Sequence, residues 1–290
     1  MIREYKNYLI LFSLALIWGS SFILMKRGLE EYSDMQVAAL RLFIAFFSLT
    51  PFIYQAFKKL KKNHIFPLFV SGVIGNGIPA FLFTKAQTSL ESSFVGILNS
   101  LTPVFTLVLG FYFFKARVSN LNIFGVLIGL FGAVLLYYSE ISESYELNID
   151  VLFVIIACIF YGFSINIIQK YLVELDSLHI AALSFLYVGP FAAYYVFSTD
   201  FIYIVKTNSG FYSLLYIIIL AILGTSISVV LFNKLIKDTS AIFASSVTYL
   251  IPIIAIFWGW MEDESIKNEH FLGASIILFG VYLVNKKDPT

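Results

Sequence analysis

Charge is scarce in this sequence. Only 13% of the 290 residues are Asp, Glu, Lys or Arg, about half the share of a typical soluble domain. The net charge is +1, which gives no reason to expect nucleic acid as a partner. A hydrophobic fraction of 59% accompanies this lack of charge. The balance favours an integral membrane protein over one or two soluble domains.

Cysteine and histidine are also scarce. The single cysteine, Cys158, excludes an intrachain disulfide and any Cys-based metal site, and we expect it in the core. His64, His179 and His270 lie far apart, without metal-ligand spacing. No phosphate-binding loop is present. The sequence therefore predicts no metal, no cofactor and no enzymatic activity.

Long apolar runs are abundant, and each is long enough to cross a bilayer as a helix. We predict ten such spans, at residues 8–27, 35–56, 65–84, 92–114, 120–138, 149–170, 178–198, 211–232, 239–260 and 270–285. If the N-terminus is cytoplasmic, the inside connections hold most of the 19 Lys and Arg, including the KKLKK stretch at 58–62. Ten spans then place both termini in the cytoplasm.

The sequence repeats itself. Matches 149 residues apart include Gly75 with Gly224, Phe83 with Phe232, Pro103 with Pro252 and Gly110 with Gly259. Trp18-Gly19 recurs as Tyr161-Gly162, at an offset of 143. We therefore predict two five-span units, 1–140 and 149–288. Because five is odd, the second unit enters the membrane inverted, an arrangement typical of secondary transporters with a midplane site between the halves.

Two predicted helices carry a proline at matching places. Pro103 lacks the amide that would bond the carbonyl of Asn99, and Pro252 likewise frees the carbonyl of Thr248. Small and polar residues share one face at 92, 96, 99, 103, 106 and 110, and again 149 residues later. Such a face can serve close helix packing, or it can line a cavity where irregular backbone is tolerated. We predict a gate or site at these breaks.

Other polar residues within the spans are candidates for the same cavity. The predicted lining is Trp18, Ser21, Asn76, Asn99, Thr102, Tyr161, Ser164, Thr225, Ser245, Thr248 and Tyr249. No carboxylate lies at mid-membrane, so proton or exchange coupling is not assigned. Arg41, about two turns into the second span, could attract anions. We expect it instead to snorkel outward or to pair with Glu30 or Glu31.

With these residues in place, the chain resembles the drug/metabolite transporter superfamily, of the EamA type, over nearly its whole length. The matching segments include WGSSFILMK (18–26), LTPVFTLVLGFYFF (101–114) and YLIPIIAIFWGWMEDESI (249–266). The resemblance implies ten helices, both termini in the cytoplasm, and a central cavity used in alternating access. One departure is that a Glu typical of each unit is present as Glu264 in the second, whereas Ala116 replaces it in the first.

The resemblance implies a bacterial cytoplasmic-membrane exporter of small organic metabolites, such as amino acids, for which a monomer suffices. Three alternatives remain open. A multidrug efflux carrier would have a broad apolar cavity. A channel would open to both sides at once. A non-transporting membrane subunit would have a dry interface between its halves.

Overall fold

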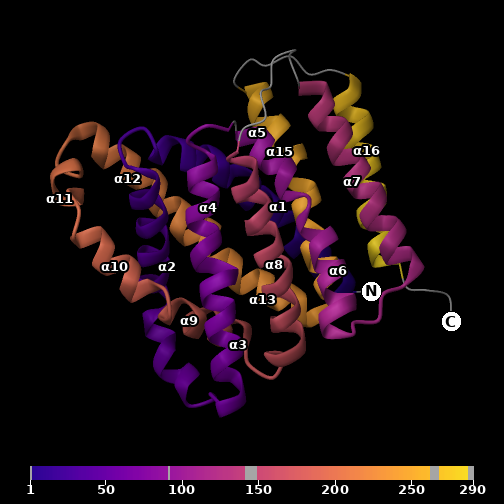
Figure 1. Ribbon diagram of the computed structural model, residues 1–290, viewed down its shortest axis with the longest axis horizontal. Helices are drawn as coiled ribbons and strands as arrows, with labels where there is room; N and C mark the ends of the chain where they lie inside the picture. Colours follow the sequence, from indigo (N-terminus) through magenta and orange to yellow (C-terminus); the bar gives the residue numbers. More distant parts are fainter. Residues whose placement is uncertain (1, 91, 141–148, 262–267, 287–290) are drawn as a thin grey trace.

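The computed structural model describes residues 2–90, 92–140, 149–261 and 268–286, and every regular element in these ranges is a helix (Figure 1). The first half contains α1 (Ile2–Gly28), α2 (Asp34–Phe57), α3 (Lys62–Gly72), η1 (Val73–Gly77), α4 (Ile78–Ala86), α5 (Ser92–Asn99), α6 (Thr102–Phe114) and α7 (Asn120–Glu140). The second half contains α8 (Val151–Tyr171), α9 (Ser177–Leu186), α10 (Gly189–Phe197), α11 (Phe201–Ile204), α12 (Asn208–Ala221), η2 (Ile222–Ile227), α13 (Ser228–Asp238), α14 (Ala241–Ser245), α15 (Val247–Met261) and α16 (Asn268–Asn285). The segments η1 and η2 are π-helical.

Six helical stretches of the described chain are long and apolar enough to cross a membrane. They are Tyr5–Gly28, Asp34–Phe57, Lys62–Ala86, Phe94–Phe114, Val151–Tyr171 and Asn208–Asp238. The pair α9 and α10, bent by 44°, adds a seventh. The other three predicted spans contain shorter apolar helices, at Asn120–Leu135, Ala241–Ile254 and Leu272–Val284. The prediction of an all-helical membrane protein is thus confirmed, and the count of ten spans stays a prediction.

The first helix of each half packs on the other half. Helix α1 contacts α12, α13 and α15, whereas α8 contacts α3, α4 and α6. The remaining helices also pair across the halves, α2 with α9 and α10, and α7 with α16 (Figure 1). Two related five-helix units would produce this pairwise correspondence. Because each half is completed by the first helix of the other, the interface between them runs through the centre of the molecule.

Helices α7 and α16 approach so closely that their backbones touch. A Cβ atom built on Gly280 would lie 2.6 Å from the amide nitrogen of Gly129 and 2.7 Å from the carbonyl oxygen of Gly125. Neither neighbouring atom belongs to a side chain that could move aside. Lipid offers no hydrophobic drive between helices, so this backbone proximity is what gives the pair its packing energy.

Polar contacts join the halves at both ends of the bundle. At one end, Tyr32 donates its hydroxyl proton to the carbonyl of Gly210 at 3.0 Å, and burial raises the pKa of Tyr32 to about 12. At the other end, Lys61 lies 2.5 Å from Glu174, and its hydrogen bond and charge hold the pKa of the Glu174 carboxyl below its ordinary value. The Lys61–Glu174 attraction is lost as pH falls through the pKa of Glu174. Both side chains are exposed, so this pair adds little stability.

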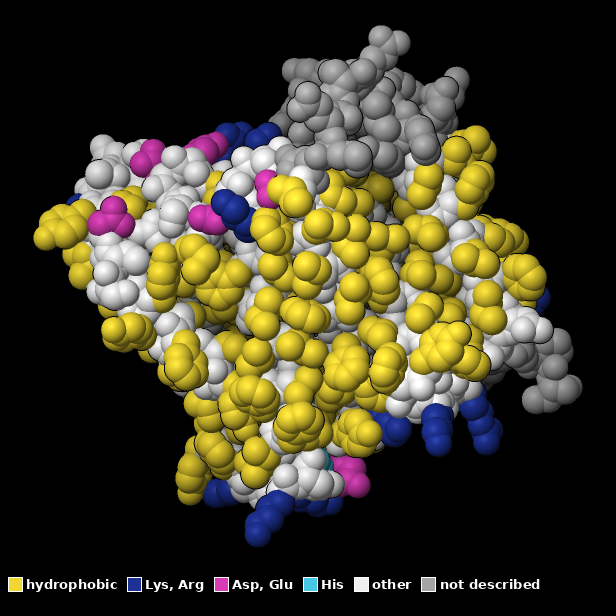
Figure 2. Space-filling model, viewed as in Figure 1, with side chains coloured by type: hydrophobic (Ala, Val, Ile, Leu, Met, Phe, Trp, Pro, Cys, Tyr) yellow, Lys and Arg dark blue, Asp and Glu magenta, His cyan; other side chains and the backbone are white. Residues whose placement is uncertain are grey.

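Charge differs between the two ends of the molecule. Hydrophobic side chains cover the broad middle of the visible face, and mainly Lys and Arg emerge at the lower end, below α3 and α6 (Figure 2). The upper end carries both signs of charge (Figure 2). An excess of Lys and Arg marks the cytoplasmic side of membrane proteins, which favours the predicted orientation with the lower end inside.

The orientation can be tested with single cysteines in a Cys158→Ala background, because Cys158 is the only cysteine of the sequence. Asn63 and Thr88 are both exposed and lie at opposite ends of the third predicted span. In intact cells, a membrane-impermeant maleimide should label Thr88→Cys and not Asn63→Cys. Permeabilised cells serve as the control, in which both variants should react. The reverse labelling pattern would show that the orientation is inverted.

The α7–α16 contact predicts a strong effect of bulk at Gly280. We expect Gly280→Leu to force the helices apart and to cost about 1–3 kcal/mol, the usual cost of overpacking. Thermal unfolding of the detergent-purified protein measures the loss. Phe279→Leu is the matched control, because Phe279 is exposed on the same helix. Equal melting temperatures for both variants would contradict the close backbone packing.

Candidate functional site

A cavity of about 110 Å³ lies where the two halves meet. It is lined from both halves, by α1, α2, α3, η1, α4, α5 and α6, together with α8, η2, α13 and α15. A buried water needs about 10–15 Å³ measured in the same way. The space therefore suits several waters or part of a small organic molecule.

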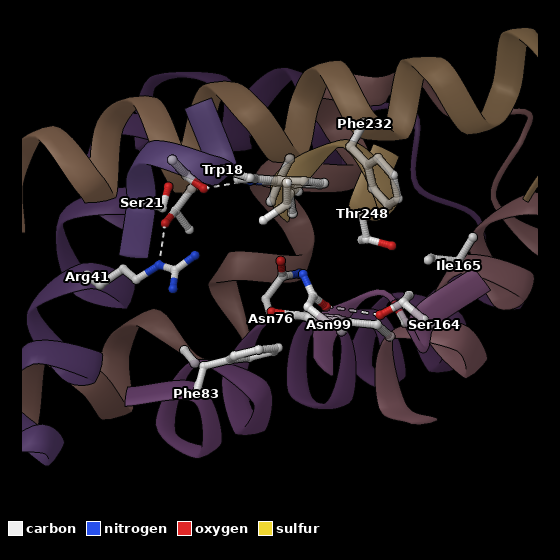
Figure 3. Close-up of a pocket in the computed structure, with 18 of the residues that line it drawn as sticks. Trp18, Ser21, Arg41, Asn76, Phe83, Asn99, Ser164, Ile165, Phe232 and Thr248 are labelled. Atoms are coloured by element: carbon white, nitrogen blue, oxygen red, sulfur yellow. Dashed lines mark hydrogen bonds between the residues drawn. The ribbon is translucent and has the colours of Figure 1, made fainter. Parts of the chain in front are cut away.

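Most of the predicted site residues meet at this cavity. Those that line it are Trp18, Ser21, Asn76, Asn99, Thr102, Tyr161, Ser164, Thr225 and Thr248. They come from seven helical elements, α1, η1, α5, α6, α8, η2 and α15, so only the tertiary fold brings them together. Figure 3 shows Trp18 on one side of the space, with Asn76 and Asn99 facing it and Thr248 and Ser164 toward one end.

Two predicted residues lie elsewhere, and the structure corrects their placement. Tyr249 is completely buried and donates its hydroxyl proton to the carbonyl of Val126 at 2.7 Å. Ser245 is also fully buried and donates to the carbonyl of Ile242 at 2.9 Å. A hydroxyl that bonds a nearby main-chain carbonyl is the usual fate of Ser in a helix. Neither residue lines the central cavity.

The two proline-containing spans are interrupted, though not at identical places. Helix α5 ends at Asn99, and Pro103 lies in the first turn of α6. In the second half the interruption falls at Ser246, between α14 and α15, and Pro252 lies inside α15. The carbonyl of Thr248, which Pro252 leaves without its amide donor, accepts a hydrogen bond from the Ser100 hydroxyl at 3.3 Å. Ser100, at the helix break of the first half, thus replaces the amide donor that Pro252 removes in the second half.

Aromatic side chains flank the cavity in equivalent pairs. The Trp18 ring contacts Phe232 edge-on, with centroids 5.0 Å apart. The ring of Tyr161 stacks on Phe83, with centroids 5.6 Å apart. Trp18 and Tyr161 are repeat-equivalent, and so are Phe83 and Phe232. Each contact therefore joins the first span of one half to the third span of the other.

The third span of each half changes from α- to π-helix beside the cavity. The segments η1 and η2 begin 149 residues apart, at Val73 and Ile222, and they carry Asn76 and Thr225. Asn76 donates to the carbonyl of Ser71 at 3.1 Å, and Thr225 to that of Leu220 at 3.2 Å. Both side chains thus bond a carbonyl five residues back. Short π-helical segments occur frequently at functional sites.

Arg41 lies in the cavity, contrary to our expectation from the sequence. Its Nε donates to the Thr225 hydroxyl at 2.6 Å, and the guanidinium points inward (Figure 3). Glu30, one of its two expected partners, pairs instead with Arg27 at 2.8 Å. The rotation of α2 about its own axis determines where Arg41 lies, because it turns this side chain toward η2 and away from lipid.

Comparison with known proteins agrees with the two-unit architecture. The EamA-like transporter family matches residues 6–138 and again residues 148–286. The chain belongs to this family. A crystal structure of a protein with 13% sequence identity has a TM-score of 0.73 over 96% of both chains, which shows the shared fold.

Several relatives of this EamA-family chain are named transporters. The uncharacterized transporter YoaV of Bacillus subtilis is 26% identical, over 96% of each chain. The uncharacterized inner membrane transporter YedA of Escherichia coli K12 is 25% identical, over 94% of this chain and 89% of that protein. A Chlamydia muridarum protein named S-adenosylmethionine/S-adenosylhomocysteine transporter is 24% identical, over 95% and 90% respectively.

Reasoning from the sequence missed part of the cavity lining of this EamA-family protein. Besides Arg41, the lining includes apolar side chains such as Phe22, Phe83 and Phe232. The repeat offered a signal for two of them, because Phe83 and Phe232 match each other. Glu264, whose counterpart in the first unit is Ala116, lies outside the described residues.

The corrected placement of Tyr249 separates a structural hydroxyl from a cavity hydroxyl. Tyr249→Phe removes the hydrogen bond to the buried Val126 carbonyl, which should cost about 0.5–1.5 kcal/mol of stability. It should not change the affinity for a solute in the cavity. Tyr161→Phe, which alters a cavity hydroxyl, provides the comparison. Thermal unfolding and solute binding, measured on both variants, check this, and weaker binding by Tyr249→Phe at unchanged stability would contradict it.

Proposed function

We propose that the protein is a secondary transporter that exports small organic metabolites, such as amino acids, across the cytoplasmic membrane by alternating access. It belongs to a family of transporters, and a small-molecule substrate and a bilayer are the partners this implies. The substrate site is the central cavity, and the monomer suffices, since one chain supplies every lining residue.

The cavity between the two halves is the observation that carries this proposal. Repeat-equivalent residues line it from both sides, as Trp18 with Tyr161 and Asn76 with Thr225. Inverted repeats place substrate sites at their interface, and movement of one half against the other exposes such a site alternately to each side. The broken helices at Asn99 and Ser246 lie beside the cavity and supply irregular backbone where a gate requires it.

The substrate class is supported by the size and chemistry of the lining. Amide and hydroxyl groups of Asn76, Asn99 and Thr248 face a space flanked by aromatic rings. Such a mixture of apolar walls and a few polar groups is typical of sites for small organic molecules. The chlamydial relative is named for two amino-acid derivatives, which agrees with solutes of this kind.

A multidrug carrier is the second candidate, favoured by the aromatic walls. The guanidinium of Arg41 in the lining opposes it, because the positive charge repels lipophilic cations in a site of low dielectric. No Asp or Glu lines the cavity in the described chain. A facilitator or an exchanger is therefore sufficient, and no coupling ion is assigned.

Transport by purified protein in liposomes tests the proposal. A panel of labelled amino acids and nucleosides should contain solutes that move in a saturable manner. For a transported solute, Asn99→Ala and Thr248→Ala should each increase the KM by a factor between about three and about ten, the effect of one lost hydrogen bond. Asn120→Ala and Thr88→Ala are matched controls, since both residues are exposed.

Three outcomes would contradict the proposal. Uptake of lipophilic cations alone would favour multidrug efflux. Ion conductance without saturation would indicate a channel. Absence of movement for all solutes, with thermal stability unaffected by any of them, would favour a non-transporting subunit.

A further inference from the structure

We propose that Arg41 is the anion-binding residue of the central cavity, and that the solute carries a single negative charge on a carboxylate. The inference rests on the proposed function, since it names the substrate class of the same site. It follows from the geometry around Arg41, from the absence of a protein counter-charge, and from the chemistry of the opposite wall.

The guanidinium is held in place with most of its donors unused. Arg41 bonds through Nε to the Thr225 hydroxyl oxygen at 2.6 Å. Thr225 gives its own proton to the Leu220 carbonyl at 3.2 Å, so its oxygen is oriented to accept. The two terminal nitrogens of Arg41 have no hydrogen-bond partner among the described residues, and Figure 3 shows them directed into the cavity. Arg41 therefore presents a fixed fork of four N–H groups to whatever enters.

No carboxylate of the described chain balances this charge. Asp34, at the start of the same helix, lies 3.7 Å from Lys85. Glu30 pairs with Arg27. The titratable neighbour of Arg41 is Tyr161, a phenol that is neutral at physiological pH. An uncompensated charge within a membrane protein is costly and marks a functional site by default.

The fold itself does not require an arginine at this place. The segment AALRLF at 38–43 matches AALSFL at 181–186, so the repeat-equivalent of Arg41 is Ser184. Ser184 is 1% exposed and packs in the corresponding helix of the second half. In the second unit, a small side chain thus occupies the position equivalent to Arg41. The charge in the other unit distinguishes the two sides of an otherwise matched cavity.

The rest of the lining indicates what the anion carries. A guanidinium fork matches the two oxygens of a carboxylate. Trp18 and Phe83 lie on opposite sides of the space next to Arg41, whereas Thr248 and Ser164 lie at the far end (Figure 3). The fitting solute has a carboxylate, an apolar or aromatic body and a polar far end. One guanidinium neutralises one charge, so a monocarboxylate fits the site better than a phosphate dianion.

Matched pairs of probes test this in the detergent-purified, full-length protein at constant ionic strength. The pairs are 3-phenylpropionate with 3-phenylpropionamide, and L-phenylalanine with L-phenylalaninamide. Sodium phosphate is the inorganic comparison. Thermal shifts and calorimetric titration should show each carboxylate binding more tightly than its amide, which has nearly the same shape.

Three variants assign the effect to Arg41. Arg41→Gln should weaken carboxylate binding by about 10- to 100-fold, the loss of a charged hydrogen bond, and should leave amide binding nearly unchanged. Arg41→Lys, which keeps the charge and is the safer variant for folding, should retain a carboxylate preference reduced in size. Arg27→Gln is the matched control, because it removes the same charge at an exposed position.

The carboxylate-minus-amide difference decides the proposal. It is supported if the difference is present in the wild type and in Arg27→Gln and is lost in Arg41→Gln. It is overturned if no carboxylate binds better than its amide, if Arg41→Gln keeps the difference, or if phosphate binds as tightly as the carboxylates. Saturable transport of neutral solutes, with no effect of Arg41→Gln, would overturn this inference and leave the proposed transport function standing.

Discussion

Inside a bilayer, each main-chain N–H and C=O group must find its partner within the protein, and the rest of this structure depends on that constraint. Helices satisfy it along most of the chain. Where a helix is interrupted, the partner must come from elsewhere. The Thr248 carbonyl takes its hydrogen bond from Ser100 of the other half. The carbonyls of Ser71 and Leu220, just before the two π-helical segments, take theirs from Asn76 and Thr225. At these places the irregular backbone lies where the two halves meet.

Many polar side chains of the membrane-spanning helices lie at the same interface. Helices α1 and α8 each pack on the opposite half, so their inward faces meet the interrupted spans. Trp18 contacts Phe232, and Tyr161 contacts Phe83, in the same way on each side. A cavity lined by matched residues is the physical basis for a site that either half could uncover. The tightly packed pair α7 and α16 provides a rigid contact away from that site, because its backbones already touch.

Arg41 breaks the match between the halves. Its equivalent, Ser184, is a small buried residue, so the charge has no structural counterpart. Burial of a charge without a partner lowers stability, and proteins tolerate such costs mainly where function requires them. In this cavity the charge of Arg41 also discriminates between solutes, because it attracts anions and repels cations. The proposed carboxylate class of solute follows from that asymmetry rather than from the family fold.

The sequence by itself determined the membrane class, the family and the repeat, because hydropathy and internal matches are properties of the chain alone. Nine of the eleven residues predicted to line the cavity do line it, since polar side chains inside apolar spans are usually turned away from lipid. Only the tertiary structure decided which way each helix faces. The rotation of α2 turned Arg41 inward, whereas the sequence predicted that it would snorkel outward or pair with Glu30 or Glu31. Packing of α15 on α7 turned Tyr249 toward the Val126 carbonyl and away from the cavity. Residue spacing fixes which side chains share a helix face, whereas the neighbouring helices fix what that face meets.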